Sequence, residues 1–254
     1  MLNKKEQICK LLKGIETGDP ESVLVVNEEK YVQHNPQTQE GSEGLAALFK
    51  RLSKTSPRIN IVRVFEDGDF VFVHTEYDFA NRNIGFEIFR FEDGQAVEHW
   101  DNIQKRKGPN NSDHSMVDGV TEVTDYRLTE SNREMIKSFV ENILIQNNWD
   151  RMNDYFNQES YTEHNPNLND DLTEFKDTLF SLNDKRSVSI EYGICHRILA
   201  EGNFVLAVCE GYAQQIHSSF YDLYRLENGK IVEHWDTRES IPARSEWKNN
   251  NGKF

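Results

Sequence analysis

The amino-acid sequence predicts an α+β protein that consists of two tandem domains. Residues 90–101 read R-F-E-D-G-Q-A-V-E-H-W-D, and residues 225–236 repeat them as R-L-E-N-G-K-I-V-E-H-W-D. Residues 31–36 (Y-V-Q-H-N-P) return as residues 161–166 (Y-T-E-H-N-P), in the same order along the chain. A repeat of about 130 residues is much longer than a solenoid unit, so each copy is large enough for its own core. Both copies begin with helical patterns and end with strand patterns, which indicates an α+β fold.

Three helical patterns open each copy. In the first helix, Ile8, Leu11, Leu12 and Ile15 recur at the spacing of one helix face. Polar residues that can cap a helix, such as Ser42 and Thr173, precede the later patterns. The expected helices are residues 3–14, 21–30 and 45–52 in the first copy, and a helix that begins at Thr129, residues 151–159 and residues 175–182 in the second.

Four strand patterns follow in each copy. Apolar residues alternate with polar ones, and Asp-Gly, Glu-Gly or Asn-Gly pairs separate several of the runs, as in β-hairpins. Each copy should therefore end in a four-stranded antiparallel meander. The expected strands are residues 58–66, 69–79, 84–91 and 96–103, and then 187–199, 203–213, 218–226 and 230–237.

A polar segment with Gly and Pro, residues 105–125, separates the two copies. We therefore expect a first domain at residues 1–115, a linker at 116–128 and a second domain at 129–254.

Composition restricts the partners of this protein. The 254 residues carry a formal charge of −14, which disfavours binding to nucleic acid or to an anionic membrane. We find no apolar run as long as the roughly 20 residues of a membrane span, and no signal peptide at the start of the sequence. The three cysteines lack the spacing of a metal site or of a disulfide framework, which favours reduced thiols. We expect a cytoplasmic protein.

The order of helices, Y-x-x-H-N-P and a meander that ends in I-F-R-F-E-D-G-x-x-V-E-H-W-D resembles the SnoaL-like polyketide cyclase branch of the nuclear transport factor 2 (NTF2-like) superfamily. The resemblance covers nearly the whole chain, in tandem duplicate. It implies that each copy is a cone-shaped α+β barrel, in which a curved sheet wraps a long helix and leaves an apolar pocket at the open end. It also implies an intramolecular pseudo-dimer of the two copies, and leaves open a further homo-oligomer.

Strand alternation indicates which side chains line such a pocket. Glu87, Phe89 and Phe91 share one face of their strand, and Asp222 and Tyr224 hold the equivalent places in the second copy. Members of the resembled family commonly have an Asp before an I-F-R triplet, the position of Glu87 and Asp222. On the preceding strand Phe72, His74 and Glu76 share a face, and Glu210 is the counterpart of Glu76.

Other histidines allow two interpretations. His34 and His164, in Y-x-x-H-N-P, either face the pocket mouth or fix the turn by hydrogen bonds to the backbone. We expect structural roles for His99 and His234 on the solvent or dimer face of the sheet, and ion pairs from Arg90 to Glu98 and from Arg225 to Glu233. The candidate catalytic residues are His34, His74, Glu76, Glu87, His164, Glu210 and Asp222, and the candidate ligand-binding residues are Phe72, Phe89, Phe91 and Tyr224.

A carboxylate in an apolar cavity resists ionisation, so it can exchange protons with a nearby imidazole. We expect His74 to act with Glu87 or Glu76 in the first copy, and Asp222 or Glu210 to act in the second. The sequence contains no H-x-x-x-H or C-x-x-C motif, no phosphate-binding loop and no nucleophile elbow, so we expect neither a metal nor a cofactor. These residues and the resemblance predict cofactor-free acid/base catalysis, namely aldol cyclisation, isomerisation or dehydration, on a small hydrophobic carbonyl compound. The alternative is a non-catalytic protein that binds a small ligand or acts as a scaffold. The second copy, which lacks a counterpart of His74, suits that alternative.

Overall fold

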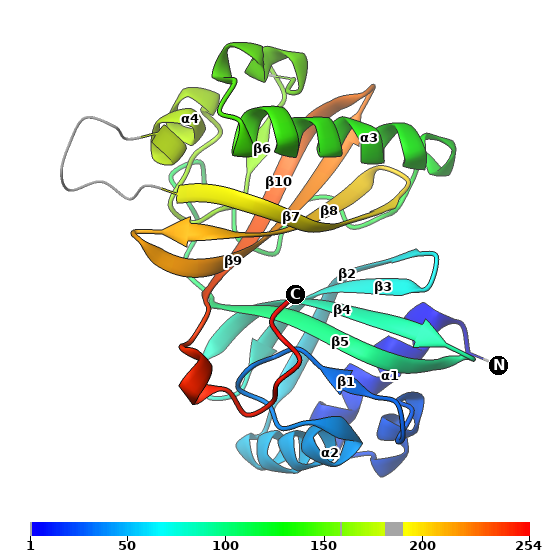
Figure 1. Cartoon of the computed structure of the whole chain (residues 1–254). Coiled ribbons are helices and arrows are strands. Elements are labelled where there is room, and N and C mark those ends of the chain that lie inside the picture. Colours follow the sequence, from blue (N-terminus) through cyan, green and yellow to red (C-terminus); the bar gives the residue numbers. More distant parts are fainter. Residues whose placement is uncertain (1, 158, 181–189) are drawn as a thin grey trace. The chain divides into compact units, whose positions relative to one another are not determined.

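The computed structural model describes residues 2–157, 159–180 and 190–254. The chain divides into two compact units (Figure 1). The first unit contains Met1–Lys105 together with Ile241–Phe254, and the second contains Arg106–Ser240. The predicted limits were 1–115 and 129–254 with a linker at 116–128, whereas residues 106–128 belong to the second unit and residues 241–254 to the first. Side chains explain both assignments, because the Asn110 amide donates to Glu163 O at 2.7 Å and the Asn249 amide donates to Asn35 O at 2.8 Å.

The first unit has a five-stranded sheet in the order β1-β5-β4-β3-β2. Helix α1 is packed against β2 and β3, and its apolar residues share one core cluster with those of the sheet. The elements are α1 (Lys4–Thr17), a 3₁₀ helix (Pro20–Val25), β1 (Val32–Gln33), α2 (Gly41–Leu52), β2 (Arg58–Asp67), β3 (Phe70–Asp78), β4 (Arg82–Glu92) and β5 (Gln95–Lys105).

The second unit repeats this topology with the order β6-β10-β9-β8-β7. Its first helix, α3 (Thr129–Phe139), continues as a π-helix (Val140–Ile145) and packs against β7 and β8. The other elements are a 3₁₀ helix (Trp149–Asp154), β6 (Thr162–Glu163), α4 (Leu172–Phe180), β7 (Ile190–Glu201), β8 (Phe204–Ala213), β9 (Ile216–Glu227) and β10 (Lys230–Ser240). The parts of the predicted helix and strand at residues 181–182 and 187–189 lie outside the described residues.

The predicted α+β fold in two tandem copies is confirmed, and local chemistry accounts for its elements. Asn3 caps α1 through a capping box with Glu6, which satisfies backbone N–H groups at the start of the helix. The β4–β5 turn has positive φ at both Asp93 (50°) and Gly94 (82°), the geometry that favours a two-residue hairpin. Over the described residues, no helix has the length and apolar character that crossing a membrane requires.

Each sheet contains one strand more than the predicted meander. The two-residue strand β1 runs parallel to β5, with Val32 opposite Glu98 and Gln33 opposite His99. In the second unit β6 pairs in the same way with β10, with Glu163 opposite His234. Two residues are too few to show a period in the sequence. These strands matter because they place the Y-x-x-H-N-P segment beside the E-H-W-D strand.

Candidate functional site

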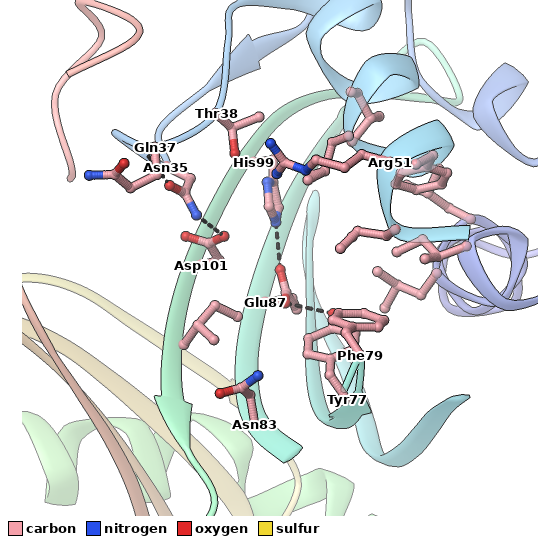
Figure 2. A pocket seen from close by; sticks show the side chains of 18 of the residues that line it. Asn35, Gln37, Thr38, Arg51, Tyr77, Phe79, Asn83, Glu87, His99 and Asp101 are labelled. Atoms are coloured by element: carbon pink, nitrogen blue, oxygen red, sulfur yellow. Dashed lines mark hydrogen bonds and ion pairs between the residues drawn. The ribbon is translucent and has the colours of Figure 1, made fainter. Parts of the chain in front are cut away.

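The first unit encloses a cavity of about 210 Å³ between the sheet and its two helices (Figure 2). Leucines, isoleucines and phenylalanines from α1, α2 and the strands form most of its wall. Polar groups enter from β1–α2, β3, β4 and β5, and this polar lining includes Asn35, Thr38, Arg51, Tyr77, Asn83, Glu87, His99 and Asp101. The cavity therefore combines an apolar wall with buried groups that can exchange protons.

Glu87 and His99 form a buried pair at this cavity. The Glu87 Oε2 atom lies 2.7 Å from His99 Nε2, and the two residues are 4% and 6% exposed. Strand register explains the pair, because β4 and β5 set Glu87 opposite Asp101 and Phe89 opposite His99. Side chains on the same face at diagonal positions of neighbouring strands lie close enough for long residues to meet.

The second ring nitrogen of His99 also faces an acceptor. His99 Nδ1 lies 3.1 Å from Gln33 Oε1, and this oxygen accepts a hydrogen bond of 2.8 Å from the Asn35 backbone N–H. Neutral imidazole has only one N–H group, yet both nitrogens of His99 face oxygen atoms. One proton must therefore lie between His99 Nε2 and Glu87 Oε2, on either atom. An imidazole and a carboxyl group within hydrogen-bond distance of each other form a positioned pair of the kind that general acid/base catalysis uses.

Tyr77 completes this group from β3. Its hydroxyl donates to Glu87 Oε1 at 2.7 Å. Burial, and next the charge of Glu87, raise the pKa of Tyr77 well above its usual value, so the phenol stays protonated at neutral pH. Gly85 leaves the space for this contact, because a Cβ atom there would lie 2.5 Å from the Tyr77 ring and 2.8 Å from Glu87 Oε1.

Asp101 lies next to the pair. Its Oδ2 accepts a hydrogen bond of 2.6 Å from the Asn35 amide, and its Oδ1 lies 3.5 Å from the Lys253 ammonium. Among the described residues, Glu87, His99 and Asp101 are the group whose potential metal-ligand atoms all come within 4.8 Å of one another. The Lys253 ammonium already brings a positive charge to this cluster.

The second unit holds its equivalent histidine differently. His234 Nε2 lies 3.1 Å from Asp222 Oδ1, and His234 Nδ1 lies 3.0 Å from both carboxylate oxygens of Glu163. Burial alone would lower the pKa of His234, but the carboxylates of Glu163 and Asp222 raise it well above its usual value. These carboxylates therefore favour the imidazolium form of His234 at neutral pH.

Asp236, the counterpart of Asp101, also differs from it. Its Oδ2 accepts from the Asn165 amide at 2.8 Å, as Asp101 Oδ2 does from Asn35, and the buried Oδ1 atoms of both aspartates have no hydrogen-bond partner. The difference is the Lys253 ammonium, which lies 3.5 Å from Asp101 Oδ1. Burial, with the charges of Asp222 and Glu163, raises the pKa of Asp236 to about 7, although the positive charge of His234 opposes this change.

The structure separates His74 from Glu87, so the predicted pairing of these two residues is wrong. In the β3–β4 register, Val73 is opposite Glu87 and His74 is opposite Phe86. His74 therefore lies on the other face of the sheet, where its Nδ1 contacts the Arg63 guanidinium at 3.0 Å. Phe72 and Glu76 share that face and do not line the cavity. The prediction failed because alternation shows which residues of one strand share a face, but not which residues of β3 and β4 are opposite each other.

The remaining predicted residues have different positions. Phe89 lines the cavity, whereas Phe91 is buried in the core outside it. Tyr224 is also in the core, with its ring stacked on His234 at 4.9 Å between centroids. Glu210 lies on the opposite face from Asp222, because Asp222 is opposite Ala207 and Glu210 is opposite Ser219.

His34 and His164 belong to the turn rather than to the cavity. His34 stacks on Trp100 at 4.6 Å and its Nδ1 lies 3.1 Å from Gly252 O, and His164 stacks on Trp235 and lies 2.8 Å from Ser115 O. Of the two interpretations, the structure favours hydrogen bonds to the backbone. The histidine that sequence reasoning placed elsewhere is His99, which faces the cavity instead of the solvent or dimer face of the sheet.

The predicted ion pair contained the signal for His99. Arg90 Nε lies 2.6 Å from Glu98 Oε2, as expected for cross-strand partners. Once Arg90 is opposite Glu98, Phe89 must be opposite His99, and so His99 shares the face of Glu87. Tyr77 had no such signal, because it required the register of β3 as well.

A family model described as the SnoaL-like domain matches residues 10–99. Similar solved structures include TsrD from Streptomyces laurentii, with 20% identity, a TM-score of 0.36, and coverage of 41% of this chain and 92% of TsrD. IdmH from Streptomyces antibioticus, proposed to be a polyketide cyclase, has 18% identity, a TM-score of 0.35 and coverage of 39% and 90%. An LEH-like epoxide hydrolase from M. tuberculosis has 16% identity, a TM-score of 0.35 and coverage of 39% and 81%. No curated protein matches the chain.

Proposed function

We propose that the first unit, whose residues 10–99 match the model of the SnoaL-like domain, is a cofactor-free acid/base catalyst. Its substrate is a small hydrophobic carbonyl compound, and its reaction is an aldol cyclisation, an isomerisation or a dehydration. The observation that carries the proposal is the buried contact of 2.7 Å between Glu87 Oε2 and His99 Nε2 at the wall of an apolar cavity.

The geometry supports a simple reaction sequence. In the ion-pair form, the Glu87 carboxylate takes a proton from the carbon next to the substrate carbonyl, and the electron pair of that C–H bond forms an enolate. Return of the proton to another carbon completes an isomerisation. Attack of the enolate carbon on a second carbonyl group completes an aldol reaction, with His99 donating a proton to the new alkoxide. A positioned acid/base pair contributes about 10²- to 10⁴-fold to such a step.

The cavity restricts the substrate. A volume of about 210 Å³ is below the roughly 300–1,000 Å³ of pockets for drug-sized ligands, so a smaller molecule fits. Most of the lining is apolar, which favours a hydrocarbon skeleton. The Asn83 amide and the Arg51 guanidinium also line the cavity and are the groups that we assign to orient a carbonyl oxygen.

For the second unit, we propose ligand binding or structural support without chemistry. The specific observation is the position of His234 between Glu163 and Asp222. One carboxylate lies at each ring nitrogen and stabilises the imidazolium ion. The raised pKa therefore disfavours release of the His234 proton at neutral pH.

The proposal is tested by exchange of substrate protons with solvent. Small cyclic and open-chain ketones and enones are incubated with the whole chain in D₂O, and loss of the α-proton signal is followed by ¹H NMR. We expect the wild-type chain to accelerate exchange in some of these compounds. Glu87→Gln should lower that rate about 100-fold or more, because the amide cannot take a proton.

The matched control is Glu92→Gln, which makes the same change on the same strand at a surface ion pair with Lys30. This variant should keep the wild-type rate. A wild-type chain that accelerates exchange in no compound, or a Glu87→Gln variant as fast as wild type, contradicts the proposal.

A further inference from the structure

We propose that segment 249–253 completes the first unit's site and that Lys253 is a positioning residue, which acts on His99 through Asp101. The inference deepens the proposed function and rests on it for its kinetic test. Segment 241–254 belongs to the first unit, although it follows β10 in the sequence.

The segment is anchored on the residues that position His99. The Asn249 amide donates to Asn35 O at 2.8 Å and to Thr38 O at 3.0 Å, and the Asn251 amide donates to Gln33 O at 2.9 Å. Asn249 is only 6% exposed. These bonds fix the backbone of the turn whose side chains reach His99 and Asp101.

Lys253 brings a buried charge to the same place. Its side chain is 3% exposed, its ammonium donates to Asp101 O at 2.7 Å, and it lies 3.5 Å from Asp101 Oδ1. A buried ammonium group is very unfavourable unless it is paired and hydrogen-bonded. Asp101 provides both a carbonyl and a carboxylate oxygen, so the pair is a specific contact.

A continuous chain of hydrogen bonds leads from Asp101 to the proposed catalytic pair. The Asn35 amide donates to Asp101 Oδ2 at 2.6 Å, and the Asn35 backbone N–H donates to Gln33 Oε1 at 2.8 Å. That oxygen faces His99 Nδ1 at 3.1 Å. The Asp101 carboxylate orients the Asn35 amide, and Gln33 then fixes the ring of His99.

The second unit shows what the site is like without this lysine. Ser115 O contacts His164 Nδ1 at 2.8 Å, as Gly252 O contacts His34 Nδ1 at 3.1 Å. The next residue is the buried Met116, whereas Lys253 follows Gly252. The buried Oδ1 atoms of Asp101 and Asp236 both lack a hydrogen-bond partner, but Asp101 Oδ1 has the Lys253 ammonium at 3.5 Å.

The charges around Asp101 come from several elements. The titratable groups close to it include Lys253 in the segment, Glu87 on β4, His99 on β5 and the protonated phenols Tyr77 on β3 and Tyr31 before β1, and Glu40 acts on Tyr31. Lys253 is the positive charge in direct contact with Asp101. Its removal leaves excess negative charge, which favours the imidazolium form of His99.

The kinetic test uses Lys253→Met, which copies the second unit, and Lys253→Arg, which keeps the charge. With the ketone that exchanges fastest in wild type, we expect Lys253→Met to lower kcat about 10- to 100-fold, with little change in KM, and to move the pH profile to higher pH. Lys253→Arg should recover most of kcat. Lys248→Met removes an exposed ammonium just before segment 249–253 and should match wild type.

A second measurement needs no substrate. ¹⁵N NMR of the His99 ring reports its protonation and tautomer as a function of pH. In Lys253→Met, the ¹⁵N signals of the ring should differ from those of wild type, with more of the imidazolium form at a given pH, because a nearby positive charge has been removed. If wild type exchanges no ketone, the proposed function fails, while this measurement still decides the role of Lys253.

Loss of Lys253 alone could prevent folding, since Asp101 would stay buried without its partner. The double variant Asp101→Asn, Lys253→Met removes both charges. If Lys253 acts through Asp101, His99 should titrate in the double variant as it does in Asp101→Asn alone. The inference would be overturned if Lys253→Met changed the His99 signals as much in the Asp101→Asn background as in wild type. Wild-type kcat together with wild-type ¹⁵N signals in Lys253→Met would also overturn it.

Discussion

The two units place the same imidazole between different partners. In the first unit His99 faces the Gln33 amide oxygen on one side and Glu87 on the other, whereas in the second unit His234 faces Glu163 and Asp222. The amide of Gln33 tolerates either protonation state of the ring, but the carboxylate of Glu163 favours the charged one. One residue in Y-x-x-H-N-P thus separates a pair that can exchange a proton from a fixed ion triad.

The two units also position a phenol on the carboxylate by different routes. Tyr77 on β3 is opposite Ile59, and it donates to Glu87. In the second unit the tyrosine is on the other strand of the pair, because Tyr192 on β7 is opposite Gly211 and its hydroxyl lies 3.1 Å from Asp222 Oδ2. Both units thus place a phenol O–H on the buried carboxyl group, which lowers the free-energy cost of burying it.

The largest expected effect concerns Asp101 and Asp236, whose replacement by Asn should change stability in opposite directions. Asp101→Asn leaves the buried Lys253 without its carboxylate and should lower the free energy of unfolding by about 3 kcal/mol. Asp236→Asn should raise it at pH 8 by up to about 4 kcal/mol, since the pKa of Asp236 rises from 3.8 to about 7 on folding. Chemical denaturation of both variants measures the difference.

The sign of the Asp236 effect depends on pH. Because its folded pKa lies above its unfolded value, the folded state binds this proton more tightly. The penalty is absent below about pH 4, grows as the pH rises to about 7, and is then constant. The advantage of Asp236→Asn should therefore disappear near pH 4. An Asp236→Asn variant that is less stable than wild type at pH 8 contradicts this account.

Gln33→Glu should convert the first site into a copy of the second. The new carboxylate would stabilise the imidazolium form of His99 and lower the exchange rate of a ketone substrate about 10- to 100-fold. The reciprocal change, Glu163→Gln, should let His234 lose its proton at a lower pH, which ¹⁵N NMR of the ring detects. Equal exchange rates in wild type and Gln33→Glu would show that the residue opposite Nδ1 does not distinguish the units.

Gly85→Ala should destabilise the first unit by about 1–3 kcal/mol, since its Cβ atom would overlap the Tyr77 ring. The second unit has no such restriction, because its counterpart Phe220 packs against Tyr192 at 4.7 Å between ring centroids. Thermal denaturation measures the loss. The double variant Gly85→Ala, Tyr77→Ala has no ring to clash with, so it should lose less stability than the sum of the two single variants. A loss equal to that sum would show that the strain lies elsewhere.

The smallest effect is expected for Tyr192→Phe, which removes one neutral donor from Asp222 and should lower stability by about 1 kcal/mol. Tyr212→Phe is the matched control, since Tyr212 lies on the adjacent strand and is 49% exposed. Equal stabilities of the two variants, measured by chemical denaturation, would remove Tyr192 from the support of Asp222.

Much of the candidate site could be predicted from residues that are close in the sequence. Asp93-Gly94 set the β4–β5 hairpin, and the ion pair of Arg90 and Glu98 set its register. That register places Glu87, Phe89, His99 and Asp101 on one face, although we first assigned His99 to the other. The predicted pairing of Glu87 with His74 was wrong because alternation along each strand does not tell which residues of the two strands are opposite each other.

The sequence by itself determined two α+β units, their meanders and the face of each strand that carries a carboxyl group, because hairpins and periodicity are local. Only the tertiary structure decided the partners of the two histidines and of the two aspartates. Gln33 lies 66 residues from His99, and Lys253 lies 152 residues from Asp101. A two-residue parallel strand and a segment without regular structure have no period that a sequence could show. Their positions follow from hydrogen bonds that form only when the whole unit is folded.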